Sequence, residues 1–182
     1  MLTGHRVILR TVREEDLDGL FDLIADVRTI GDHWPLRIGS ESEWRKKFHE
    51  NGWWSEDFGR MLLTDRDGER LGYLNYYMPS HSYHGREIGY RIFRPEDRRR
   101  GYMSEAIPLF VAYLFGAKTI ERIQALAHPD NEGSCRLLER CGFTFEGTLR
   151  HAHYDRGTYN DLQMYSILRA DAPELSSLLA PP

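Results

Sequence analysis

Cysteines and long apolar runs are scarce in this chain of 182 residues. The two cysteines, Cys135 and Cys141, would lie far apart in angle around one helix, so a disulfide between them is unfavourable. So few cysteines exclude a disulfide-rich secreted scaffold and suit a reducing cytoplasm. No apolar run is long enough to span a bilayer, and the N-terminus has no signal-peptide pattern. We therefore expect a cytoplasmic protein with no membrane partner.

A surplus of positive charge is also missing. The chain has 24 lysines and arginines against 28 aspartates and glutamates, for a net charge of −4. This balance argues against a nucleic-acid partner. The sequence contains neither a Walker phosphate loop nor the Gly-x-Gly-x-x-Gly fingerprint of dinucleotide-binding proteins. Its histidines and cysteines do not form a metal-binding motif, so we expect no metal.

The composition that remains is that of one globular domain. Hydrophobic residues make up 41% of the chain and charged residues 29%, and the length suits a single core. The pattern alternates strands and helices, which predicts a mixed α/β fold with helices packed on a twisted sheet. We place this domain at residues 3–169, followed by a loose C-terminal tail over residues 170–182 that contains proline and serine.

Periodicity and punctuation residues give the approximate elements. The expected strands are residues 6–11, 60–64, 71–78, 87–93, 120–127, 145–152 and 158–168. Expected helices begin near residue 14 and cover residues 41–50, 101–115 and 132–141. Thr11 and Glu14 fit a capping box, and Pro108 is expected to kink or loosen its helix because it lacks a backbone donor.

The most informative segment lies between an expected strand and an expected helix. Residues 98–106 read Arg-Arg-Arg-Gly-Tyr-Met-Ser-Glu-Ala. The first N–H groups of a helix have no internal partner, the helix dipole is positive there, and Gly101 allows an anion to approach closely. The segment therefore predicts a site for the diphosphate of a cofactor. The alternative is a solvated run of charges before a helix.

This segment resembles the acetyl-CoA loop of the GNAT acetyltransferases, Gln/Arg-x-x-Gly-x-Gly/Ala. Arg98 and Gly101 match it, whereas Met103 stands where the pattern has Gly or Ala. Residues 131–143 (Asn-Glu-Gly-Ser-Cys-Arg-Leu-Leu-Glu-Arg-Cys-Gly-Phe) are similar to a second family segment, and Glu-Gly follows at 146–147. Residues 7–17 and 154–169 resemble the branch that contains the ribosomal-protein N-terminal acetyltransferases of the Rim type. The resemblance covers about residues 5–169.

The resemblance implies a GNAT-like fold, with a mostly antiparallel sheet, helices on both faces and splayed central strands that hold acetyl-CoA. The pantetheine arm would add to the strand end near residues 92–94, and Asn131 would bind it, although Asn131 also suits a helix N-cap. The residues expected to bind acetyl-CoA are Ile92, Phe93, Arg94, Arg98, Arg99, Arg100, Gly101, Tyr102, Met103, Ser104, Asn131 and Ser134.

Acetyl transfer to an amine requires a group that removes a proton, because a free amine is mostly protonated at neutral pH. Glu87 is the best candidate, since many family members carry a catalytic glutamate on this strand. An ordinary glutamate is a weak base, so Glu87 would act through a water molecule or in surroundings that increase the basicity of its carboxylate. The alternative is that Glu87 only pairs with Arg91 on the same strand face.

The second catalytic candidate is Ser134, the polar group expected nearest the sulfur. Many family members have a tyrosine further along this helix to protonate the leaving thiolate, but Leu138 occupies that position here. Serine is a poor acid, so Ser134 would supply a hydrogen bond or a relay. Its alternative role is that of an ordinary serine in the first turn of a helix.

The acceptor pocket is expected to be aromatic, and the alternative for Trp53 and Trp54 is a lid packed on the core, since large aromatic residues are often buried. The expected lining residues are Trp34, Trp53, Trp54, Tyr76 and Tyr159. The leading hypothesis is an acetyl-CoA-dependent N-acetyltransferase that acts on a protein N-terminus or a small amine by direct attack in a ternary complex. The alternative is a non-catalytic acyl-CoA-binding sensor or assembly module on the same fold. A homodimer is one oligomeric state that the sequence leaves open.

Overall fold

The computed structural model describes residues 1–36, 38–79 and 85–181. The strands are β1 (Leu2–Thr3), β2 (Val7–Thr11), β3 (Phe58–Asp65), β4 (Arg70–Tyr77), β5 (Gly85–Ile92), β6 (Arg122–Ala127), β7 (Thr144–Asp155) and β8 (Thr158–Leu168). The helices are α1 (Leu17–Ala25), α2 (Val27–Ile30), α3 (Glu41–Asn51), α4 (Tyr102–Ala117), α5 (Glu132–Arg140) and α6 (Leu175–Leu178), with short 3-10 turns at Glu14–Asp16, Pro95–Asp97 and Arg169–Asp171. These elements agree with the predicted alternation of strands and helices.

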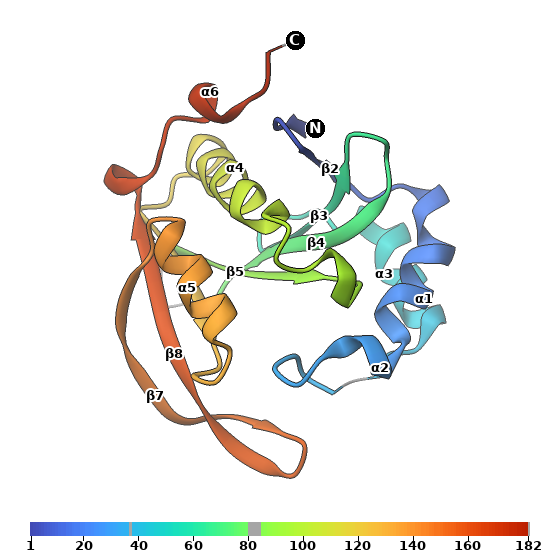
Figure 1. Ribbon diagram of the computed structural model, residues 1–182. Helices are drawn as coiled ribbons and strands as arrows, with labels where there is room; N and C mark the ends of the chain where they lie inside the picture. The colour runs from blue at the N-terminus through green and yellow to red at the C-terminus, as the bar shows by residue number, and fades with distance from the viewer. Residues whose placement is uncertain (37, 80–84, 182) are drawn as a thin grey trace.

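The described strands form one sheet in the order β1-β2-β3-β4-β5-β6-β8-β7. Neighbouring strands are antiparallel except for β5 and β6, which run parallel and are joined by α4 as a crossover (Figure 1). The mixed, mostly antiparallel sheet confirms the predicted fold class.

Each face of the sheet carries its own hydrophobic core, because successive side chains of a strand point to opposite faces. Leu63 points into a large core that packs against α4 and α5, whereas Leu62 points into a smaller core with residues of α1 and α3. The aromatic residues Trp53 and Tyr73 belong to the smaller core. Helices therefore cover both faces, as predicted.

The parallel strands β5 and β6 are paired over a short distance only. The pairs are Gly85 with Arg122, Arg86 with Ile123 and Glu87 with Gln124, although β5 continues to Ile92. Beyond Glu87, β5 remains paired with β4, and β6 remains paired with β8. The two halves of the sheet therefore separate after Glu87, which is the splay that the sequence led us to expect.

Two local predictions at the ends of the chain are wrong. The capping box is not formed by Thr11 and Glu14. The N-cap of the first 3-10 turn is Arg13, whose backbone N–H donates a hydrogen bond to the carboxylate of Asp16. Residues 170–182 are not loose as far as the structure describes them: α6 packs on α4, and the backbone N–H of Ala180 donates to Thr3 at 2.8 Å.

Pro108 lies inside α4, and the helix continues through it to Ala117. Proline cannot donate to the carbonyl four residues earlier, which is that of Ser104. That carbonyl instead accepts a weak hydrogen bond from Cys141 Sγ at 3.9 Å. Cys141 and Cys135 are both buried and unbridged, as the sequence predicts. Burial raises the pKa of Cys141 to about 11, so its thiol keeps the proton that it donates.

Candidate active site

The loop before α4 has the backbone geometry of an anion site. Arg99 and Gly101 both have left-handed conformations, with φ values of 61° and 83°, and α4 begins directly afterwards. The N-cap residue is Gly101, which has no side chain that could accept a hydrogen bond from the first N–H groups of the helix. The first N–H groups of this 16-residue helix therefore lack helical and side-chain cap partners, at the end where the helix dipole is positive.

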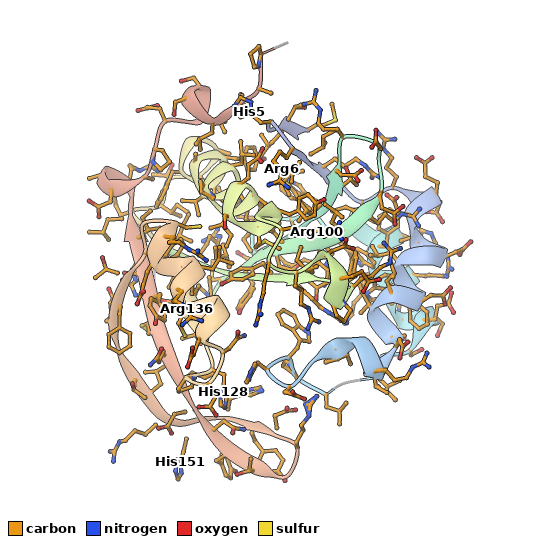
Figure 2. All side chains as sticks on the ribbon, in the orientation of Figure 1. His5, Arg6, Arg100, His128, Arg136 and His151 are labelled. Carbon is orange, nitrogen blue, oxygen red and sulfur yellow. The ribbon has the colours of Figure 1, made fainter. Side chains whose placement is uncertain are left out.

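A cation from another part of the chain lies against this loop. The guanidinium of Arg6 is 5.1 Å from the centre of the Tyr102 ring, and a Cβ at Gly101 would be 3.1 Å from Arg6 Nη1. Figure 2 shows Arg6 and Arg100 near the N-terminal end of α4, where the loop leads into the helix. Arg6 precedes β2 and was not among the predicted site residues. No local pattern connects Arg6 with the loop, because more than 90 positions of the chain separate them.

Glu87 lies where β5 and β6 part, and it is only 6% exposed. Its carboxylate accepts hydrogen bonds from the Tyr77 hydroxyl and, at 2.8 Å, from Gln124 Nε2. Tyr77 is opposite Glu87 on β4, and Gln124 is opposite Glu87 on β6. Three polar side chains therefore form one row across three strands. Burial and the carboxylate of Glu87 raise the pKa of Tyr77, which keeps its hydroxyl protonated as a donor.

The face of β5 that carries Glu87 also carries Gly89, two residues further along. A Cβ at Gly89 would be 3.8 Å from Trp34 and 3.9 Å from Tyr77. The absence of a side chain at Gly89 thus leaves space for the two rings over this part of the strand face. Trp34 also makes an edge-on contact with Tyr73. Trp34 and Tyr77 therefore lie over the face of β5 that carries Glu87.

The other predicted aromatic residues lie elsewhere. Trp53 is 4% exposed and packs on Trp44 and Phe48, and Tyr76 is fully buried in the larger core with Trp54 against it. Tyr159 is 63% exposed near the tip of the β7–β8 hairpin. Trp53 packs in the same smaller core as Trp34 but is buried there. Trp54 and Tyr76 pack in the larger core and Tyr159 lies on the exposed hairpin, so we leave these four residues out of the proposed acceptor site.

Ser134 lies in the first turn of α5, where its hydroxyl is 2.7 Å from that of Tyr90 on β5. Asn131 is the N-cap of this helix, and its side chain accepts from the backbone N–H of Ser134 at 3.2 Å. The capping role considered for Asn131 is thus present. Leu138 is fully buried in the core. No sequence signal singles out Tyr90, because Ile88 and Ile92, two positions away on either side, make this face look like an ordinary buried strand.

The described residues contain no cluster of histidine, cysteine, aspartate or glutamate suited to a metal ion. Among the described helices, none combines the length and apolar character needed to span a membrane.

Residues 6–144 match the family model described as an acetyltransferase (GNAT) domain. The chain belongs to the GNAT acetyltransferase family. The chain is 41% identical over 173 residues to the uncharacterized N-acetyltransferase YoaA of Bacillus subtilis, covering 93% of this chain and 97% of that protein. It is 24% identical to the ribosomal-protein-serine acetyltransferase of Escherichia coli, covering 87% of this chain and 90% of the relative.

Solved structures have the same fold. The spermidine N-acetyltransferase from Vibrio cholerae in complex with CoA and spermine superposes with a TM-score of 0.80 at 20% identity, covering 91% of this chain and 96% of that one. The family match and the identity to YoaA, together with this fold, make this GNAT protein an N-acetyltransferase, and acetyl-CoA is its co-substrate. The uncapped loop before α4 and the gap between β5 and β6 fit that co-substrate, one providing N–H groups for phosphate and the other an unpaired strand edge.

The predicted acetyl-CoA residues of this GNAT protein differ in what they can offer. Phe93 is fully buried and its backbone N–H already donates to the carbonyl of Leu71 at 2.9 Å. Met103 is 7% exposed, so its backbone N–H in the first turn of α4 is the part that it can offer a ligand. Met103 replaces a small residue of the family pattern without blocking the loop, because its side chain belongs to the core. Arg94 pairs with Glu69, and Arg100 is 3.9 Å from Asp97. Exposed or half-buried positions are Ile92, Arg98, Arg99, Gly101, Tyr102, Ser104, Asn131 and Ser134.

Proposed function

We propose that this N-acetyltransferase acetylates a primary amine by direct attack in a ternary complex, with Glu87 as the group that accepts the proton of the amine. The observation that carries this proposal is the position of Glu87 at the point where β5 and β6 separate, beside Trp34 and Tyr77. A buried carboxylate beside aromatic rings attracts a cationic amine, and it can take a proton as the nitrogen becomes a nucleophile.

The acceptor is a protein N-terminus or a small amine. Both classes occur among the relatives, since one named relative acts on ribosomal protein and one named structural neighbour is a spermidine acetyltransferase. We expect a cytoplasmic enzyme, and a homodimer remains one of its expected oligomeric states. A panel of acceptors tests the class: spermidine, monoamines and short peptides with serine or alanine at the N-terminus, with CoA release as the signal. If none of the amines in the panel causes release of CoA, the proposal is contradicted.

Replacing Glu87 by glutamine tests the base. At neutral pH turnover should fall at least about tenfold, because the amide keeps the shape but cannot accept a proton. The loss should shrink at high pH, where the amine is already neutral. The matched control is Glu15→Gln, whose side chain is 70% exposed and pairs with Arg13. A Glu87→Gln pH–rate profile that parallels that of the unmodified enzyme would show that Glu87 is structural.

A further inference from the structure

The hydrogen bond between Tyr90 and Ser134 spans the gap between the two halves of the sheet. Tyr90 is on β5, beyond the last residue that pairs with β6, and Ser134 is in the helix that follows β6. The hydroxyl oxygens are 2.7 Å apart, and both residues are partly buried. Glu87 and Gln124 make a polar contact between β5 and β6, whereas this bond links β5 to α5 and lies on the opposite face of β5.

The surroundings of the pair favour one direction for this hydrogen bond. Cys135, Cys141 and Tyr165 are the titratable neighbours of Tyr90, and each of their side chains donates a hydrogen bond to another group. A phenol is a better donor than an alcohol. At this distance either hydroxyl can be the donor; with the phenol of Tyr90 as the donor, the proton of Ser134 is free to bond a group in the gap.

We propose that Tyr90 is a positioning residue for Ser134, whose hydroxyl donates a hydrogen bond to the sulfur that leaves when the acetyl group is transferred. This inference rests on the proposed function. In that reaction the bond from carbonyl carbon to sulfur breaks, the bond to the amine nitrogen forms, and sulfur keeps the electron pair. The ammonium form loses one proton to Glu87 before attack, and Glu87 passes that proton to solvent. The second proton leaves the nitrogen by the same route as the amide forms, and the thiolate takes a proton from solvent after release.

The pair stabilises the thiolate and does not protonate it. Burial raises the pKa of Tyr90, whereas an ordinary thiol has a pKa of about 8.5. A proton on Tyr90 therefore stays there, and a buried phenolate does not form. Two aligned hydroxyl groups polarise each other, so the donor strength of Ser134 depends on Tyr90.

The test measures the bound thiol and does not require an acceptor. Ultraviolet absorbance of the thiolate gives the ionisation of bound CoA from about pH 6 to about pH 10. Ser134→Ala should make thiolate formation roughly tenfold less favourable, and Tyr90→Phe roughly threefold, since hydrogen bonds to charged groups are the strong ones. In the Ser134→Ala background, Tyr90→Phe should change nothing further.

The matched control is Tyr165→Phe, which removes a hydroxyl that bonds to Gln163. It should leave the thiol unchanged, and urea unfolding should show that all variants are folded. The proposed role of Tyr90 would be overturned if Tyr90→Phe left the ionisation of the bound thiol unchanged. It would also be overturned if Tyr90→Phe had the same effect in the Ser134→Ala background as in the unmodified protein. Failure of the unmodified protein to bind CoA would instead contradict the function on which the relay rests.

Discussion

Asp16 shows how single residues set the pH response of this protein. The residue is 1% exposed, and its carboxylate accepts two hydrogen bonds from Arg10, at 2.6 and 2.9 Å, and one from the backbone N–H of Arg13. Arg70 Nε lies 3.3 Å away. Burial alone would raise the pKa of Asp16. The hydrogen bonds from Arg10 and Arg13 and the two positive charges outweigh it, and the pKa is lowered.

Replacing Asp16 by asparagine should therefore destabilise the protein by on the order of 3 kcal/mol at pH 7, because it leaves two arginines without their carboxylate. Since the folded-state pKa lies below the unfolded value, near 3.9, the charged form stabilises the fold above about pH 4. That stabilisation is lost as the pH falls through the folded-state pKa. Urea unfolding at decreasing pH should show the difference between the two proteins shrinking.

The control is Glu15→Gln, because Glu15 is an exposed neighbour with a salt bridge to Arg13. It should cost less than about 0.5 kcal/mol at any pH. A loss in Asp16→Asn that is equal at neutral and acidic pH would show that shape, and not charge, is what matters at this position.

At the scale of elements, the loop and first turn of α4 carry the acetyl-CoA prediction. Gly101→Val should weaken CoA binding at least about tenfold, for two reasons. A β-branched residue is strained at φ 83°, and its side chain would occupy the space beside Arg6 where phosphate would approach. Isothermal titration calorimetry with CoA checks this.

Gly116 lies near the other end of the same helix, where an added Cβ would meet nothing within 4 Å. Gly116→Ala should therefore keep full CoA affinity and gain slightly in stability, because alanine is the better helix former. Unchanged CoA affinity in a folded Gly101→Val protein would remove the loop from the binding site.

Local patterns in the sequence predicted most elements but few of the contacts between them. The strand before Arg98 and the helix after Gly101 follow from periodicity and a glycine, which are local signals. Gln124 was missed because its partner Glu87 is 37 positions away, and their contact depends on strand order. The sequence allows Trp53 to line the acceptor pocket or to pack on the core, because a large aromatic residue in a loop gives no indication of what covers it.

At the scale of the whole molecule, the C-terminal segment connects distant parts of the chain. Leu175 and Leu178 pack on the larger core, and Ala180 bonds to Thr3 near the N-terminus. The tail was predicted to be loose because proline and serine are typical of disordered ends, and the apolar surface that receives the leucines is visible only in the fold.

Truncation after Asp171 should lower stability by about 3 kcal/mol, about half the burial energy of each of two leucines plus one hydrogen bond. For a protein of this size that corresponds to a fall of roughly 6–12 °C in Tm. Differential scanning calorimetry measures it, and Leu175→Ala combined with Leu178→Ala should account for most of the loss. The exposed Leu179 is the control, since Leu179→Ser should leave Tm nearly unchanged. A truncated protein with the Tm of the full chain would show that the segment contributes no stability.

The early end of the β5–β6 pairing also has a consequence for the exchange of backbone hydrogens. Alternate N–H groups of a strand point to opposite sides, and beyond Glu87 the described part of β5 has a strand neighbour on the β4 side only. Every second amide between Ile88 and Ile92 should therefore take up deuterium quickly, while its neighbours, bonded to β4, remain protected. A molecule that lies along the open edge of β5 would slow those fast amides alone. Binding in the gap should therefore be detected as slower exchange at every second amide of β5, and this measurement does not depend on knowing the acceptor.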